Sequence, residues 1–464
     1  MLANWTFLQH PVFLIVCGVL GGLLGYAWPA AGPAMEALAS VYVLLLQMSA
    51  LPLIIVAVIF GLRQMMSLPN ASVRISAALV GGVLTVIFAS TLGTLGAAAV
   101  MKNDGLSEDN RIALGQLSSN SQSSLEMALR TPEEEQPARN LRQELLPSNY
   151  FKSLAVGAIP AILLGALVFG LAFSQQTSST AKTFFGPLEM IYRSLEVLID
   201  RINSLLPLAV MAFAGGLAGS NDLALMRSIG SFWVPFMAGT MLMALLTLLL
   251  LTRQSGQSLG AVIRAMIKPM TICMFSPIPT AAVPSYIDAM SAKLGFTRAI
   301  VELMTPLAPY FMRSGEALFF SMLGVFIARF YGHDLQALEL AQIALLSALA
   351  AFVSIGTLGV ASLMVSTVML VTLDLPIEGV LPALLAIEVV CGGARNLISS
   401  LLACGLIALI SSGLTREYIE VKTAMTDGFF RASADRRLVW VALGLCAVAM
   451  LLTFLIGVGV GIRR

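Results

Sequence analysis

Long apolar segments recur along this chain, and they decide what it can fold into. Crossing a bilayer as a helix takes about 20 apolar residues. Of the 464 residues, 58% are hydrophobic and only 11% are charged, and the mean hydropathy is +0.89. Ordinary water-soluble domains do not have this composition. The sequence therefore predicts an all-α polytopic membrane protein, with conventional spans near residues 11–28, 37–62, 75–101, 153–175, 190–218 and 229–252.

Composition also excludes several classes of function. The net charge is only +2 and the basic residues are scattered, so we expect no nucleic-acid partner. The few cysteines are far apart and lie in apolar surroundings, and the chain has only two histidines, so we expect buried thiols and no metal site. No phosphate-binding loop or nucleophile elbow is present, and we predict neither an enzyme nor a bound cofactor. The cysteines are Cys17, Cys273, Cys391, Cys404 and Cys446.

The charges between the spans indicate how the chain lies in its membrane. Residues 102–150 form one long polar insertion with more acidic than basic residues. Basic residues elsewhere fall on the opposite side of the membrane if the spans alternate. The positive-inside rule then places the N-terminus in the cytoplasm, and we expect a multi-pass protein of a bacterial inner (plasma) membrane. These basic residues are Arg63, Arg74, Lys182, Arg227, Arg253, Arg264 and Lys268.

After residue 258 the apolar segments are interrupted where a simple span should continue. FSPIPTAAVP occupies Phe275–Pro284, and SIGTLGVAS occupies Ser354–Ser362. Irregular backbone at membrane depth is tolerated only around a cavity or inside protein, and a pair of broken helices is typical of a transporter's binding site. The simpler interpretation, two kinked spans without a site, stays open.

Each interruption is followed by a segment that carries charge inside an apolar run. Residues 296–331 contain Arg313 and Glu316, and residues 387–403 contain Glu388 and Arg395. A charge inside a bilayer is costly unless it faces a partner, water or a ligand, so the default hypothesis is a binding site. On a helix, Glu388, Gly392, Arg395 and Ser399 share one stripe, and the glycine leaves space beside the guanidinium. The alternative is that the four charges form internal salt bridges.

The order of these segments resembles a known family. Six spans, a re-entrant hairpin, a span, a second hairpin and a last span are the arrangement of the dicarboxylate/amino acid:cation symporters, the glutamate transporter homologues. The resemblance runs from about residue 10 to residue 412. Its clearest pieces are QMSALPLIIVAVIFG at 47–61, LPSNYFKSLA at 146–155, SIGTLGV at 354–360 and the helix that carries Glu388 and Arg395.

The resemblance implies eight spans, two re-entrant helical hairpins and a homotrimer that moves its substrate by an elevator motion. Residues 1–257 would hold the first six spans, mostly scaffold and trimer contacts with part of the transport domain. Residues 258–412 would be the transport core. Residues 413–464 would be a cytoplasmic loop and an extra C-terminal span near 438–460, which the family usually lacks.

The resemblance also implies a substrate site. Arg395 matches the arginine that binds a carboxylate of an acidic substrate, which a planar guanidinium can hold with two hydrogen bonds. Gly392 stands where amino-acid carriers have an aspartate for the substrate's amino group, so a dicarboxylate without an amino group is favoured. Other positions implied to contact substrate are Arg313, Glu316, Ser276, Thr280, Gly356, Thr357, Gly359, Asn396 and Ser399.

The cation positions depart from the family. Its NMDGTAL motif falls on MRSGEAL at 312–318, so Met312 and Ser314 replace an asparagine and an aspartate. In the eighth span, Ser399 and Ala403 replace another asparagine and aspartate. Sodium prefers hard oxygen ligands, and two carboxylates are lost. We therefore expect coupling to protons or to another cation, with Glu316, Glu388, Ser354 and Ser314 as the coupling positions and no metal site.

Taken together, these residues predict a secondary active transporter, a symporter of a small anionic organic acid, for which we expect a C4-dicarboxylate. Its partners would be that anion, a coupling cation, membrane lipid and further copies of the chain. One alternative is a glutamate or aspartate symporter in which Glu316 binds the ammonium group. A second, from another class, is a sensor or an anion channel derived from the family that has lost coupled transport.

Overall fold

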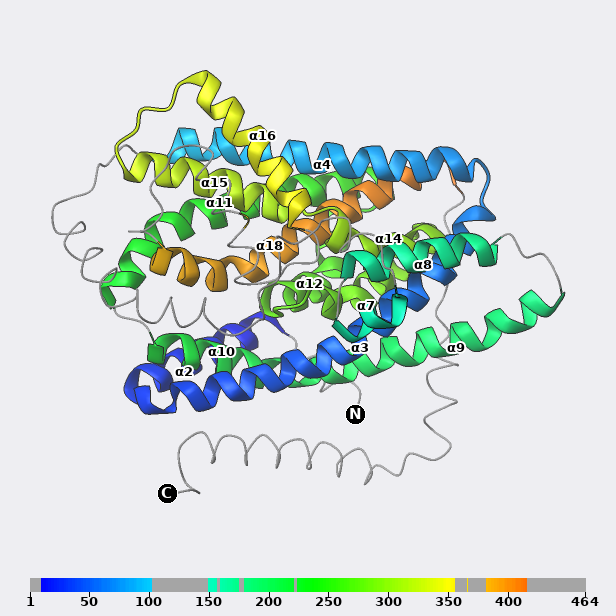
Figure 1. Ribbon diagram of the computed structural model, residues 1–464, viewed down its shortest axis with the longest axis horizontal. Coiled ribbons are helices and arrows are strands. Elements are labelled where there is room, and N and C mark those ends of the chain that lie inside the picture. Colours follow the sequence, from blue (N-terminus) through cyan, green and yellow to red (C-terminus); the bar gives the residue numbers. More distant parts are fainter. Residues whose placement is uncertain are drawn as a thin grey trace, which may run out of the picture.

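All regular elements that the structure describes are helices (Figure 1). The computed structural model describes residues 10–101, 149–156, 159–174, 179–220, 223–354, 365 and 381–414. The first part contains α2 (Pro11–Ala27), η2 (Pro29–Ala31), α3 (Gly32–Met66), α4 (Ala71–Val100), α7 (Tyr150–Val156), α8 (Ile159–Ser174), α9 (Ser179–Ile202), η3 (Asn203–Leu205), α10 (Leu206–Ser220) and α11 (Leu223–Ser255).

The second part of the chain is built from shorter pieces. After Ser255 follow α12 (Leu259–Phe275), η4 (Pro279–Ala282), α13 (Val283–Ile287), the π-helical turn η5 (Asp288–Lys293), α14 (Arg298–Phe311), α15 (Ser314–Phe330), α16 (Ala337–Val353) and α18 (Leu381–Ile410).

Six helical stretches within the described residues are long and apolar enough to cross a membrane. Three shorter apolar helices accompany them: Pro11–Ala27, Ala161–Phe173 and Ala337–Val353. The predicted class, an all-α polytopic membrane protein, is therefore confirmed. The six stretches are Pro29–Met66, Ala71–Val100, Gly186–Gly216, Phe232–Ser255, Arg298–Phe330 and Val390–Ile410.

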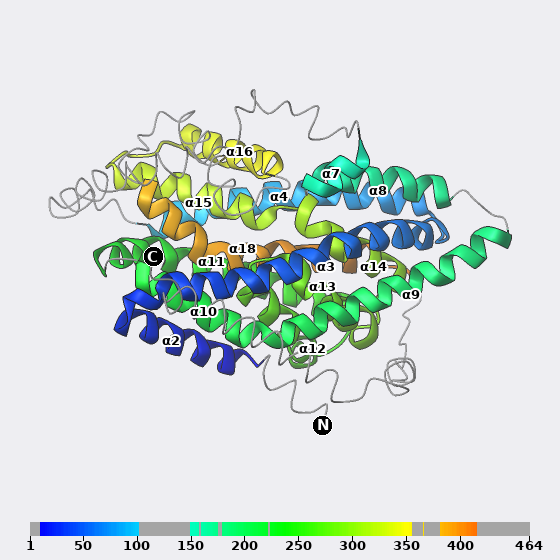
Figure 2. The same ribbon diagram turned by 60° about the horizontal axis from the view of Figure 1, so that its bottom comes forward.

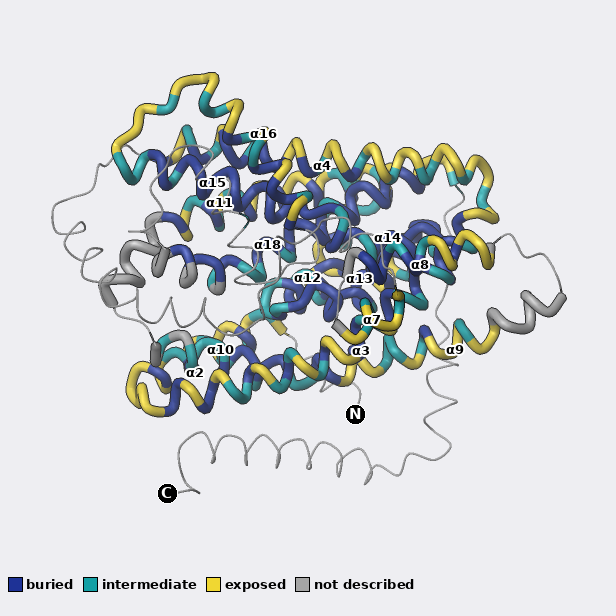
Figure 3. The backbone as a smooth tube through the Cα atoms, viewed as in Figure 1, coloured by how far each residue is buried: buried dark blue, intermediate teal, exposed yellow. Residues whose placement is uncertain are grey.

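Burial separates central from peripheral helices. In the most apolar windows of the Arg298–Phe330 and Val390–Ile410 stretches, 89% and 83% of residues are buried, against 22% in Ala71–Val100. The exposed face of α4 carries large apolar side chains such as Leu79 and Leu95, as a lipid-facing surface requires. Figure 3 shows the same contrast between α4 and α18.

The helices lie roughly along the long axis of the molecule and surround α18. In Figures 1 and 2, α2, α3, α9 and α10 lie on one side and α4, α15 and α16 on the other. Helix α18 packs against α11, α12, α14 and α15, and α14 also packs against α3. The segment with Glu388 and Arg395 is thus the centre of the fold.

Two breaks in the helices set up the site. The first lies where the sequence predicts it, because α12 ends at Phe275 and the backbone of Ser276 and Ile278 is extended. The second was not predicted: residues 296–331 form not one long segment but α14 and α15, which are separated at Met312 and Arg313. The amide of Gly315, freed by this break, donates to the Ser399 hydroxyl at 3.0 Å, which shows how the interior tolerates it.

Several predictions lie outside the described residues. They are Gly356, Thr357 and Gly359, most of the loop at 102–150, and the extra span near 438–460. Of the second interruption, Ser354 is described, directly after the end of α16 at Val353.

Candidate functional site

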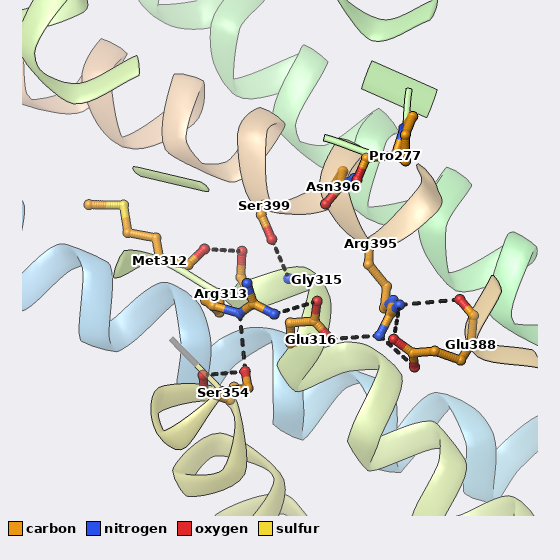
Figure 4. Close-up of polar contacts among 12 residues, drawn as sticks. Pro277, Met312, Arg313, Gly315, Glu316, Ser354, Glu388, Arg395, Asn396 and Ser399 are labelled. Atoms are coloured by element: carbon orange, nitrogen blue, oxygen red, sulfur yellow. Dashed lines mark hydrogen bonds and ion pairs between the residues drawn. The ribbon is translucent and has the colours of Figure 1, made fainter. Parts of the chain in front are cut away.

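Four charged side chains meet in the interior of the helical bundle (Figure 4). Arg313 and Glu316 come from the start of α15, and Glu388 and Arg395 come from α18. All four are buried. Isolated charges at such positions would be strongly destabilising, so their arrangement needs a compensating set of contacts.

The compensation is a chain of ion pairs. Glu316 joins the two arginines with one oxygen each: Oε1 accepts from Arg313 Nη2 and Oε2 from Arg395 Nη1, both at 2.8 Å. Arg395 also donates from Nη1 to Glu388 Oε2 at 2.9 Å and from Nη2 to the other oxygen of that carboxylate. Arg313 Nε donates to the Ser354 hydroxyl at 3.1 Å. The four formal charges cancel.

The pairing on α18 follows from its sequence. Glu388 and Arg395 are seven residues apart, which is about two turns of an α-helix and places them on one face. Gly392 lies between them, and a methyl group at this position would still be 3.7 Å from Arg395 Nη2. The predicted stripe and the space beside the guanidinium are both present.

One nitrogen of the Arg395 guanidinium makes no hydrogen bond to the described residues. The Cζ atom of Arg395 lies over the ring of Phe319, 4.5 Å from the centroid. Its Nε is buried and has no hydrogen-bond partner among the described residues. A buried donor without an acceptor is unfavourable by about 1–3 kcal/mol. At this position in the cluster, an added hydrogen-bond acceptor would therefore be most stabilising.

Other predicted residues hold the backbone around the ion pairs. Asn396 Nδ2 donates to the carbonyls of Ser276 and Pro277, at 3.5 and 3.3 Å, and so ties the end of α12 to α18. The Ser276 hydroxyl donates to the carbonyl of Ile278 at 3.2 Å. Thr280 is also buried, and its hydroxyl has no partner among the described residues.

The positions at which the resemblance implies sodium ligands hold other groups. The Met312 side chain is buried and lies against Gly82 of α4. The Ser314 hydroxyl donates to the Met312 carbonyl at 3.5 Å, and the Ser399 hydroxyl accepts from the backbone of α15. Ala403 is buried. A thioether, two hydroxyls and a methyl group supply no negative charge for a cation.

Phe319 and Gly315 belong to the site but were not among the residues predicted from the sequence. Phe319 follows Glu316 by three residues and therefore shares its helix face, which is a signal the sequence did contain. Gly315 packs directly against the backbone carbonyl of Arg395, where a side chain has no room. Only the packing of α15 on α18 reveals this.

Gly315→Ala is expected to destabilise the site, because its new methyl group would overlap the Arg395 carbonyl. Overpacking of this kind costs about 1–3 kcal/mol, and a backbone group cannot move aside as a side chain can. We expect a lower melting temperature in detergent and a loss of ligand binding. The control is Gly96→Ala on α4, where the methyl group would meet open space and the melting temperature should not fall. A wild-type melting temperature for Gly315→Ala would contradict this packing.

Comparison with known proteins agrees with the resemblance seen in the sequence. A family model described as the sodium:dicarboxylate symporter family matches residues 12–409. The chain is similar to C4-dicarboxylate transport proteins of Cupriavidus necator and Cupriavidus taiwanensis. Each is 24% identical over 424 residues, covering 89% of this chain and 92% of the relative. The chain therefore belongs to the sodium:dicarboxylate symporter family, whose members are membrane transporters and not enzymes.

Proposed function

We propose that the protein is a secondary active transporter that carries a C4-dicarboxylate together with protons across a bacterial inner membrane. The similar proteins are named for C4-dicarboxylate transport. Gly392 supports the choice of a substrate without an amino group, because no carboxylate stands at that position.

The observation that carries this proposal is the position of the Glu316 carboxylate. It binds two guanidinium groups, one with each oxygen, at 2.8 Å. A substrate carboxylate has the same shape and charge, so it can replace Glu316 on Arg395 and also use the unpartnered Nε. The second carboxylate of the substrate would then bind Arg313. Glu316 thus holds the site while no substrate is bound.

Displacement of Glu316 provides the link to protons. Once the substrate takes both arginines, the Glu316 carboxylate is left in an apolar interior without these partners, which is strongly unfavourable for a charge. A proton bound to Glu316 removes that charge.

The proposal also includes the number of spans, the hairpins and the division into domains. We place eight spans and two re-entrant hairpins in the chain, with the N-terminus in the cytoplasm. Residues 1–257 would form mostly the scaffold and trimer contacts, and residues 258–412 the core that moves as an elevator. Residues 413–464 would add a cytoplasmic loop and one further span. The long polar loop would face the outside.

The substrate class is tested by uptake and counterflow of labelled succinate, with aspartate in parallel, in proteoliposomes. We expect succinate to accumulate against its gradient and to show counterflow, and aspartate to compete weakly. Preferential accumulation of aspartate would make the protein an amino-acid carrier. Flux without accumulation would indicate a channel, and binding without flux a sensor. Each of these three results would overturn the proposal.

A further inference from the structure

A second group of charges, with one fully buried carboxylate among partly exposed partners, lies between α14, α9 and α3 and shares no residue with the candidate site. Its centre is Glu302 of α14, whose side chain is 0% exposed. Glu302 Oε1 accepts from Arg193 Nη2 of α9 at 2.7 Å and from Arg298 Nε of its own helix at 2.5 Å. Gln64 of α3 donates to Oε2 at 3.4 Å. We call these residues, together with Glu189 and Glu196, the Glu302 cluster.

This cluster crosses a boundary that matters for motion. Arg193 and Gln64 belong to the part proposed as scaffold, and Glu302 belongs to the proposed transport core. The contact around it is close: Gly61 of α3 lies against the backbone of Leu303, where a Cβ atom would not fit. Movement of the core past the scaffold must therefore separate Glu302 from Arg193.

Each partner of the crossing ion pair has a second partner on its own helix. Glu302 has Arg298 four residues earlier. Arg193 has Glu196 at 2.8 Å, three residues later, and Glu189 at 3.7 Å, four residues earlier. Residues at these spacings are neighbours on a helix, so these pairs do not depend on the packing of α9 against α14. The Glu302–Arg193 contact can thus break without leaving either charge alone.

This arrangement differs from what a permanent buried ion pair needs. A lone buried pair cannot be separated without leaving each charge in the interior without a partner, which is strongly unfavourable. Here the partners Arg298, Glu189 and Glu196 compensate both halves after separation. The own-helix partners would be redundant if the contact never opened.

We propose that the Glu302–Arg193 pair is a reversible latch that holds the core against the scaffold in the conformation of this structure. The inference rests on the elevator movement that the proposed function includes, because it assigns the contact to the start of that movement. Arg298 keeps Glu302 compensated in the open state.

The test measures distances between spin labels at Leu198→Cys on α9 and Leu345→Cys on α16, both at exposed positions. The native cysteines are replaced, and labelled chains are diluted with unlabelled ones. Without substrate, we expect one dominant distance and a minor second one. In Glu302→Gln and in Arg193→Gln, the population at the second distance, divided by that at the first, should rise at least about tenfold.

Two further variants separate a latch from simple structural support. Arg298→Gln keeps the crossing contact but removes the compensation of the open state, so it should lower the second population. Lys268→Gln removes an exposed ion pair with Asp200, at 3.2 Å, between α12 and α9. Exposed pairs contribute little, so the wild-type ratio is expected.

An unchanged distance distribution in Glu302→Gln and Arg193→Gln would overturn the latch, as would a shift in Arg298→Gln in the same direction as in Glu302→Gln. Succinate uptake by the unlabelled wild type is measured separately. If uptake occurs and the distances do not change, only the latch is wrong. If uptake is absent and the distances shift, the latch stands and the transport proposal fails.

Discussion

Replacing Arg395 by alanine is expected to abolish succinate binding and uptake. In the proposed complex this guanidinium binds a substrate carboxylate away from water, and removing one partner of such a buried ion pair costs about 2–5 kcal/mol. This corresponds to at least about a 30-fold loss of affinity. Arg395→Lys should recover only part of it, because an ammonium group lacks the planar fork that holds a carboxylate with two hydrogen bonds. Affinity is measured by titration of the purified protein with succinate.

The loss of binding must be separated from loss of the fold, because Arg395→Ala also leaves Glu388 buried without its arginine. The double variant Arg395→Ala/Glu388→Ala removes both charges and should regain melting temperature without regaining binding. Arg329→Gln is the matched control. Its guanidinium donates to the Ala98 carbonyl at 2.6 Å, away from the four charges of the site. Wild-type affinity in Arg395→Ala would remove this residue from the substrate site.

The second large effect is expected for Glu316→Gln. Glutamine keeps the shape of the side chain, but it cannot take up a proton when the substrate binds and release that proton when the substrate leaves. Accumulation of succinate driven by a pH gradient should fall to passive equilibration, while exchange of internal for external succinate continues. The measurement compares the two assays in the same proteoliposomes.

The control for Glu316→Gln is the same change at Glu339. Its carboxylate caps the start of α16 by accepting from the backbone N–H of Gln336 at 2.8 Å. Glu339→Gln should keep both net uptake and exchange. If pH-driven uptake by Glu316→Gln equals that of the wild type, Glu316 has no part in coupling.

The helical period is what made the α18 half of the site predictable. Glu388, Gly392 and Arg395 lie on one helix, and their spacing alone puts them on one face. The apolar runs likewise predict membrane helices, because length and composition suffice for that inference. The resemblance then identified the family, which the comparisons confirm.

Contacts between distant segments could not be predicted in the same way. The break before α15 depends on Gly315 meeting the Arg395 backbone, a contact between residues 80 positions apart. In the sequence, nothing distinguishes Glu302 from an ordinary charge on an amphipathic helix. Its partners Arg193 and Gln64 are 109 and 238 residues away, so only the packing of α14 on α9 and α3 shows its role.

The sequence left two interpretations open for the four charges, a substrate site or internal ion pairs. In the structure the ion pairs are formed, and the proposed function treats them as the resting state that substrate and protons replace. The departures at Met312, Ser314, Ser399 and Ala403 remain the basis for expecting protons in place of sodium.

One measurement tests this account most directly: uptake of labelled succinate into proteoliposomes under a proton gradient alone and under a sodium gradient alone, with Arg395→Ala as the control. We predict accumulation with the proton gradient, none with the sodium gradient, and none in the variant under either. Sodium-driven accumulation by the wild type would contradict the account, because it would show that a cation site exists without the carboxylates that the family uses.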